Sequence, residues 1–193
     1  MAKEDKEDKR IGILEAADKV FYNQGFDGAK MEDIAKEAGI GKGTLYEYFV
    51  SKKQLFEEMM VYNQKRYLAG IVEAIRSGSN FREKFIALAK HQVRLVKEHA
   101  GILEQMAYFR GVSREFGALL VEQDVKFSEI LKKMVLEAKE NGEIRPEVDL
   151  DISVAIITGT IIHYCCKNVL FYNTDPQSID YDRLWEVVMK GIG

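Results

Sequence analysis

The stretch Met31-Glu-Asp-Ile-Ala-Lys-Glu-Ala-Gly-Ile-Gly-Lys-Gly-Thr-Leu-Tyr-Glu-Tyr-Phe49 decides the fold of this 193-residue chain. Its apolar residues recur at helical spacing on both sides of Gly39, which predicts short helices over about 31–38 and 42–48. Gly39 can adopt the positive φ that a sharp reversal between two helices requires. This is the layout of a helix-turn-helix, whose second helix enters the major groove of DNA. We therefore predict a DNA-reading head near the N-terminus.

The second predicted helix carries the residue types that contact DNA. Recognition helices reach base edges with their first residues, which places Lys42 and Thr44 in front. Hydroxyl groups and ammonium groups bind phosphate oxygens, and a glycine lets the backbone approach them closely. Residues 41–53 contain Lys42, Lys52 and Lys53 against Glu47, a local charge of 3 − 1 = +2. The predicted DNA-binding residues are Lys30, Lys42, Gly43, Thr44, Tyr46, Tyr48 and Lys52.

The bulk composition limits the other function classes. The net charge is −3 and the pI about 5.8, so DNA binding has to come from a local basic patch. The acidic pI leaves open an alternative, a helical protein-interaction module without sequence-specific DNA binding. The sequence has no glycine-rich phosphate loop after a strand and no nucleophile motif, which argues against an enzyme. The three histidines lack a repeated ligand spacing, so we expect no metal and no cofactor.

The two cysteines and the N-terminus predict a cytoplasmic protein. Cys165 and Cys166 are adjacent and cannot staple distant segments, which fits a reducing compartment. We expect buried, hydrophobic thiols there rather than a redox trigger. The charged N-terminal decapeptide is not a secretory signal. The longest uncharged run, 152–166, is 15 residues long, below the ~17–25 that span a bilayer, so we expect no membrane contact.

The rest of the chain predicts an all-α fold of about nine helices. Residues 1–9 alternate acid and base and predict a frayed tail or a solvated first turn. Helical apolar spacing and capping residues then mark the helices, and no strand is predicted. We divide the chain into a three-helix DNA-binding domain, residues 1–50, and a helical ligand-binding and dimerisation domain, residues 51–193. The first helix is expected from Arg10 to a C-terminal cap at Gly25. The further helices are expected at about 51–75, from 81 to the break at Gly101, and at 102–109, 113–140, 149–173 and 180–190.

The larger domain is predicted to form a dimer and to hold a ligand. The helix at about 149–173 is apolar nearly all round, and a second copy is the simplest cover for it, together with the helix at 180–190. Aromatic and Met side chains suit a cavity for a small, largely apolar effector, although each is also explained as ordinary core. We expect such a ligand to shift the helix that follows Ser51. This shift would change the distance between the DNA-binding domains of the two subunits. The candidate lining residues are Met106, Tyr108, Phe109, Phe116, Gln123, Phe127, His163 and Tyr164.

Residues 13–56 resemble the DNA-binding domain of the tetracycline-repressor (TetR) family. The resemblance implies a homodimeric, ligand-responsive transcriptional regulator, usually a repressor, that binds a pseudo-palindromic operator. It also implies DNA contacts at Thr44, Tyr46, Tyr48 and Lys52. The chain departs from the family where Ser or Thr usually precedes each motif helix, because Ala29-Lys30 and Gly41 stand there. The matching residues are Ile13-Leu14, Ala16-Ala17, Val20-Phe21, Gly25-Phe26, Ile34-Ala35, Ala38-Gly39, Lys42-Gly43-Thr44-Leu45-Tyr46, Tyr48-Phe49, Lys52 and Leu55-Phe56.

Overall fold

The computed structural model describes residues 2–98 and 114–191, with side chains described for 6–98 and 121–191. This part of the chain is helical and holds no strand, which confirms the predicted all-α fold. The predicted helix at 102–109 lies outside the described residues.

The described part of the chain divides into two compact units, residues 2–66 with 114–119, and residues 67–98 with 120–191. The first unit is called the head here and the second the body. Residues 52–66 group with the head, so the contacts place the division later than the predicted boundary after residue 50. The boundary of the DNA-binding domain itself stays a prediction.

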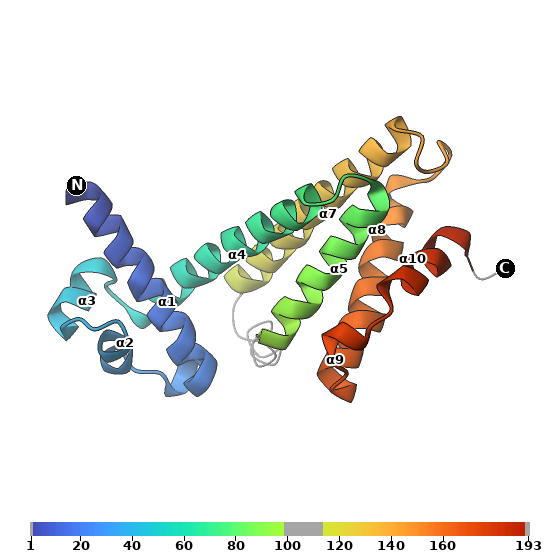
Figure 1. Ribbon diagram of the computed structural model, residues 1–193. Coiled ribbons are helices and arrows are strands. Elements are labelled where there is room, and N and C mark those ends of the chain that lie inside the picture. Colours follow the sequence, from blue (N-terminus) through green and yellow to red (C-terminus); the bar gives the residue numbers. More distant parts are fainter. Residues whose placement is uncertain (1, 99–113, 192–193) are drawn as a thin grey trace. The chain divides into compact units, whose positions relative to one another are not determined.

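The head consists of helices that begin and end close to their predicted positions (Figure 1). The first helix already begins at Ala2, so of the two alternatives for residues 1–9 the structure agrees with solvated helix rather than a frayed tail. Extending a formed helix adds one hydrogen bond for each residue ordered, so a charged segment can continue it without apolar contacts. Gly25, at φ +70°, breaks the helical geometry near the predicted end of this helix. The helices are α1 (Ala2–Gly28), α2 (Met31–Glu37), α3 (Lys42–Tyr48) and α4 (Lys52–Arg76).

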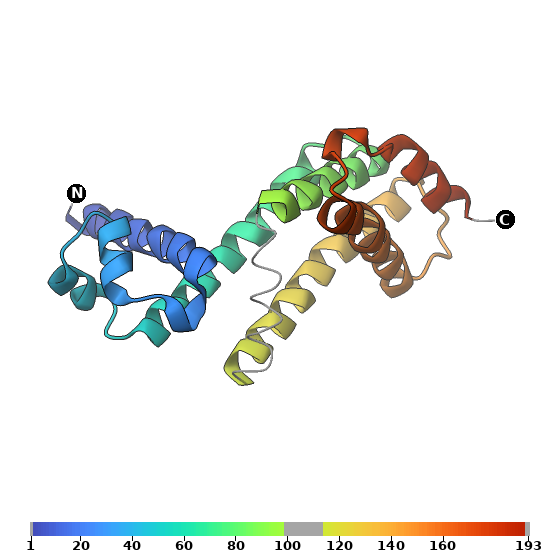
Figure 2. The same cartoon turned by 90° about the horizontal axis from the view of Figure 1, so that it is seen from below.

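The body begins within α4. Local side-chain caps mark the start of two of its further helices. The Asn80 and Asp149 side chains accept hydrogen bonds from backbone N–H groups three residues on, both at 2.9 Å. Figures 1 and 2 show α5 running beside the long helix that η1 and α9 continue. The elements are α5 (Phe81–Glu98), α7 (Arg114–Glu140), α8 (Leu150–Gly159), the π-helix η1 (Thr160–Cys166), α9 (Lys167–Tyr172), the short 3-10 helix η2 (Pro176–Ser178) and α10 (Tyr181–Lys190).

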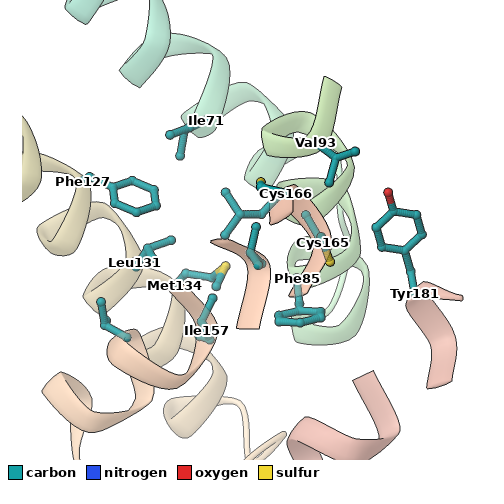
Figure 3. Packing of buried hydrophobic residues seen from close by; sticks show 14 of the residues in the cluster. Ile71, Phe85, Val93, Phe127, Leu131, Met134, Ile157, Cys165, Cys166 and Tyr181 are labelled. Atoms are coloured by element: carbon teal, nitrogen blue, oxygen red, sulfur yellow. The ribbon is translucent and has the colours of Figure 1, made fainter. Parts of the chain in front are cut away.

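The core of the body is apolar and continuous across these helices (Figure 3). Phe85, Leu131 and Ile161 are fully buried. The Trp185 ring packs against Phe85 at 5.4 Å between ring centroids and joins α10 to this core. Burying side chains of this size is the main force that holds such helices together.

The predicted helix at 149–173 is interrupted by the π-helix η1, which the sequence did not indicate. A π-helix has five-residue rather than four-residue hydrogen-bond spacing, so it shifts which side chains share a face. Cys165 and Cys166 are both buried here, whereas His163 and Tyr164 are exposed. The shift therefore removes two predicted pocket residues from the interior of the protomer.

The continuous helix Leu150–Tyr172 is longer than the uncharged run suggested. It has 23 residues, its most apolar window has a mean hydropathy of 1.5, and a third of that window is buried. Length and composition alone would allow it to cross a membrane, whereas the 15-residue uncharged run 152–166 predicts no membrane contact. An apolar helix that is partly exposed in one protomer also fits a subunit interface, and the two explanations differ in what they predict for the purified protein.

Candidate nucleic-acid interface

An aromatic cluster holds the head together. Phe21 lies 5.8 Å from Phe26 and 5.1 Å from Phe56, and Phe26 lies 5.2 Å from Phe56, between ring centroids. Two of these three contacts have the edge-to-face geometry that aromatic rings favour. The cluster ties α1 to α4, and α2 and α3 complete this small unit.

The turn between α2 and α3 is formed as the sequence predicts. Gly39 has φ +66°, and its N–H donates to the Lys36 carbonyl at 3.1 Å. The Ile40 N–H donates to the Ala35 carbonyl at 3.0 Å, which satisfies a second carbonyl at the end of α2. Glycine adopts this left-handed backbone more readily than any residue with a Cβ, so Gly39 sets the corner of the helix-turn-helix.

Helix α3 presents a polar, hydroxyl-rich surface and keeps its apolar residues inside. Leu45 and the following Phe49 are fully buried. Gly43 has no atom within 4 Å of where a Cβ would stand, so its backbone is open to a close approach. Of the predicted contact residues, Lys30, Lys42, Gly43 and Tyr46 are exposed, and Thr44 and Tyr48 are half-buried.

Lys42 is paired with Glu32, a partner that the sequence did not indicate. Its ammonium donates to the Glu32 carboxylate on α2. This hydrogen bond and the Lys42 charge lower the pKa of Glu32, and the same contact raises the pKa of Lys42. Both side chains are exposed, so the pair can open to solvent or to another ligand. The Lys42 ammonium at the start of α3 is therefore paired with a carboxylate in this structure.

Lys52 contacts backbone carbonyls, and its contact with a DNA phosphate stays a prediction. Its Nζ donates to the carbonyls of Phe26 at 2.7 Å, Asp27 at 3.3 Å and Ala29 at 2.9 Å. It also lies 4.7 Å from the centre of the Phe26 ring. An ammonium has three donors, and here all three are engaged. Lys52 therefore ties α4 to the end of α1, where it stabilises the carbonyls that the helix leaves unpaired.

The predicted N-cap departures are present in the structure. Neither Lys30, which precedes α2, nor Gly41, which precedes α3, makes a side-chain cap hydrogen bond. The first N–H groups of α3 therefore have no side-chain acceptor at the cap position. Free N–H groups at a helix start favour an anion such as a phosphate.

The predicted effector pocket is only partly covered by the structure. Met106, Tyr108 and Phe109 lie outside the described residues, as does the side chain of Phe116. Phe127 is part of the core of the body, Gln123 is half-buried, and His163 and Tyr164 are exposed. The described residues thus do not bring the predicted lining together. A cavity of about 430 Å³ lies elsewhere, beside Gly78, Arg82, Lys90 and Asp182.

Gln92 and the two cysteines are buried in the body. The Gln92 amide donates to the Tyr67 hydroxyl at 2.8 Å, so this buried glutamine bonds a neighbouring helix. Burial raises the pKa of Tyr67, and the Gln92 hydrogen bond opposes that shift. Burial also raises the pKa of Cys165 to about 12 and that of Cys166 to about 11. Protonated, buried thiols are poor nucleophiles, which favours a packing role for both cysteines.

Comparison with known proteins agrees with the geometry of the head. Residues 13–59 match the family described as "Bacterial regulatory proteins, tetR family". The HTH-type transcriptional regulator UidR of Escherichia coli K12 is 30% identical over 144 residues, 72% of this chain and 71% of UidR. The fatty acid metabolism regulator protein of Bacillus subtilis is 26% identical over 157 residues, 81% of either chain.

Solved structures show that the similarity of fold extends through the body. The transcriptional regulator FadR of Bacillus subtilis, solved in complex with stearoyl-CoA, superposes with a TM-score of 0.74 at 21% identity, covering 95% of this chain and 99% of FadR. The fatty acid degradation regulator FadR of Bacillus halodurans gives 0.74 at 20% identity, covering 94% and 98%. The identity to UidR over most of both chains, together with the formed helix-turn-helix, leads to one conclusion. The chain belongs to the TetR family of bacterial transcriptional regulators.

Proposed function

We propose that this regulator is a cytoplasmic repressor that binds a pseudo-palindromic operator as a homodimer and leaves it when an effector occupies the body. The observation that carries the proposal is the surface of α3, which buries Leu45 and exposes Lys42, Gly43 and Tyr46 around it. A helix of this kind, held against a packed head, is what major-groove reading requires. Membership of the TetR family argues against the alternative of a protein-interaction module.

The proposed DNA contacts follow from exposure and chemistry. Lys42 and Thr44, at the start of α3, are assigned to base edges or the nearest phosphate. The hydroxyls of Tyr46 and Tyr48 and the exposed ammonium of Lys30 are assigned to phosphates, and Gly43 to close backbone approach. Lys52 stays a proposed phosphate contact, and its bonds to the carbonyls at the end of α1 also give it a positioning role.

Replacing Glu32 with Gln should strengthen DNA binding. The substitution removes a negative charge beside α3 and frees Lys42 for a phosphate. We expect about two- to fivefold tighter binding, the size typical of an exposed ion pair. The slope of log affinity against log salt should steepen by up to roughly 2 for a dimer, one phosphate contact per subunit. The measurement is a salt series of binding titrations on a duplex selected by the wild-type protein from random sequences.

Glu37→Gln is the matched control for this substitution. Glu37 also lies on α2 and is exposed, but it pairs with Lys19 of α1 at 3.1 Å rather than with α3. Its removal should leave the salt slope unchanged. Equal effects of the two variants would contradict the role of Lys42, and failure of the wild-type protein to select any sequence would contradict the proposed function.

The proposed dimer interface is the exposed apolar face of the helix formed by α8, η1 and α9, together with α10. Large apolar side chains on this surface are exposed in the protomer, which is unfavourable unless another surface covers them. A two-fold axis there would make the interface self-complementary and would set two heads about one DNA turn apart, ~34–36 Å. The exposed residues are Ile152, Ile156, Ile162, Tyr164, Phe171, Tyr172, Val187 and Met189.

The proposed effector is a largely apolar molecule with a polar end, of the fatty acyl-CoA class. The support comes from the relatives named for fatty acid metabolism and from the FadR complex with stearoyl-CoA. Among the described residues, the body also holds two buried polar atoms without a hydrogen-bond partner, His91 Nε2 and Thr158 Oγ1. Buried polar atoms of this kind are usually satisfied, so a polar group of a ligand would stabilise them.

Stearoyl-CoA should therefore release the protein from its selected duplex, with an apparent affinity for DNA lowered by about tenfold or more. Free coenzyme A should have little effect, because it lacks the apolar chain that the body would bury. The measurement is a binding titration at increasing concentrations of each compound. No release by any acyl-CoA from octanoyl to stearoyl would rule out this effector class while leaving the DNA assignment intact.

A further inference from the structure

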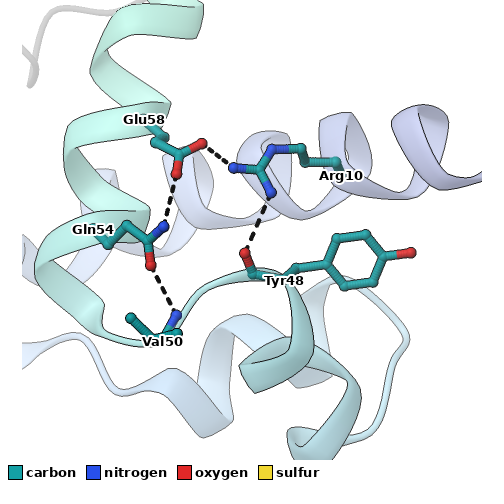
Figure 4. Close-up of polar contacts among 5 residues, drawn as sticks. All are labelled: Arg10, Tyr48, Val50, Gln54 and Glu58. Atoms are coloured by element: carbon teal, nitrogen blue, oxygen red, sulfur yellow. Dashed lines mark hydrogen bonds and ion pairs between the residues drawn. The ribbon is translucent and has the colours of Figure 1, made fainter.

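A closed set of polar contacts fixes the C-terminal end of α3 to α1 and α4 (Figure 4). Arg10 of α1 donates through Nη1 to the Tyr48 carbonyl at 3.3 Å, and through Nη2 to the Glu58 carboxylate. The other Glu58 oxygen accepts from the Gln54 amide at 3.0 Å. The Gln54 carbonyl oxygen accepts from the Val50 N–H at 2.9 Å. These contacts bind the last carbonyl of α3 and the amide two residues beyond it.

The geometry points to Arg10, Glu58 and Gln54 as positioning residues that orient α3 for selective reading of DNA. This assignment rests on the proposed function, because it requires α3 to be the reading helix. In Figure 4 the Tyr48 side chain points away from Arg10 and Glu58, so only its backbone is held and its hydroxyl stays available. The three residues thus act on α3 without occupying its polar surface.

Arg10 is suited to this place for three separate reasons. Its guanidinium lies 4.4 Å from the centre of the Phe49 ring, directly after α3. Its charge stands beside a carbonyl at the C-terminus of a helix, where a cation is favourable. Its planar fork donates to Tyr48 and Glu58 from two separate nitrogens while it lies over the Phe49 ring, a geometry that the compact ammonium of a lysine lacks. Arg10 and Glu58 are about one-third exposed, so the pair is shielded in part from screening by salt.

The two ends of α3 are held differently. At its start, Lys42 makes an exposed ion pair with Glu32, which a phosphate can replace. At its end, three half-buried side chains from two other helices form the set just described. The orientation of α3 in a groove therefore depends on its C-terminal end. Loss of that hold should let α3 sample several orientations, of which only one matches the operator.

Replacing Glu58 with Gln separates this role from simple electrostatics, because the two predict opposite signs. Removing a negative charge near DNA should tighten binding to any duplex. Loss of the Arg10 partner should instead weaken binding to the selected duplex by about tenfold, the worth of a charge-assisted hydrogen bond. We expect that weakening for the selected duplex only, with binding to a scrambled duplex unchanged or tighter. The measurement is the ratio of the two affinities at one salt concentration.

Glu57→Gln is the matched control, since Glu57 is the neighbouring acid on α4 and pairs only locally, with Lys53 at 3.6 Å. It should keep or raise both affinities. Arg10→Lys keeps the charge and should still lower the ratio. Gln54→Ala removes the contacts to Val50 and Glu58 but leaves the Arg10–Glu58 pair and the Arg10 bond to the Tyr48 carbonyl, so it should lower the ratio less. In the double variant Arg10→Met with Glu58→Gln, the loss should be smaller than the product of the two single losses.

A merely structural role has a different signature. It would lower the amount of folded head and reduce both affinities together, leaving their ratio as in the wild-type protein. That result, or a Glu58→Gln protein that behaves like Glu57→Gln, would overturn the assignment. Should Glu58→Gln fail to fold by circular dichroism, Arg10→Lys and Gln54→Ala decide the question by the same ratio. A wild-type protein that selects no sequence would overturn both the proposed function and this assignment.

Discussion

Glutamate at both Ile156 and Phe171 should convert the proposed dimer into single subunits and lower operator affinity by about a hundredfold or more. Both side chains are exposed in the protomer, Phe171 by 76%. Full burial of such a side chain contributes about 1.5–3 kcal/mol. In a two-fold interface each substitution occurs twice, and each new carboxylate would be buried without a partner. A single subunit then binds one half-site and loses an avidity of about 10²–10⁴.

Sedimentation velocity without detergent and binding to the selected duplex measure the two effects. Leu136→Glu is the control, because Leu136 is an exposed apolar residue of the same body that lies on α7, outside the proposed interface. It should leave both measurements unchanged. A wild-type protein that is monomeric at high concentration contradicts the interface. Recovery of the wild-type protein only with lipid or detergent would favour the membrane explanation for Leu150–Tyr172.

Alanine at Phe49 should lower the free energy of unfolding of the head by about 3–5 kcal/mol, the range for removing a buried aromatic ring. Phe49 is fully buried and directly follows α3. Its ring also lies under the Arg10 guanidinium, so the substitution removes that contact as well as the packing. A loss of this size is a large part of the stability of a small unit. We expect weak operator binding at 25 °C and partial loss of helical circular dichroism.

Urea denaturation followed by circular dichroism measures this change. The adjacent Val50→Ala is the control, because the Val50 side chain is 76% exposed and should cost less than about 0.5 kcal/mol. Its backbone N–H, which Gln54 binds, is retained in the variant. A Phe49→Ala protein as stable as Val50→Ala would show that this ring does not support α3.

The places where helices begin and end could be predicted because their causes are local. Asn80 and Asp149 cap the N–H groups of the next turn, and Gly39 and Gly142 adopt positive φ at the ends of their helices. Capping bonds and left-handed glycines depend on residues within one turn, which a sequence shows directly. The partner of the buried Gln92 amide depends on packing between helices, and only the structure identifies it as the Tyr67 hydroxyl.

The outward face of α3 was determined by the sequence alone. The spacing of Ile34, Leu45 and Phe49 indicates which side must be buried, and all three are fully buried in the fold. What lies against the polar side chains was decided by tertiary structure. Lys42 meets an acid ten residues earlier, Lys52 meets carbonyls 23–26 residues earlier, and Arg10 meets an acid 48 residues later. No periodicity in the sequence predicts such pairs. Long, flexible side chains can bond to any suitable group within reach, and only the packing of the helices determines which groups those are.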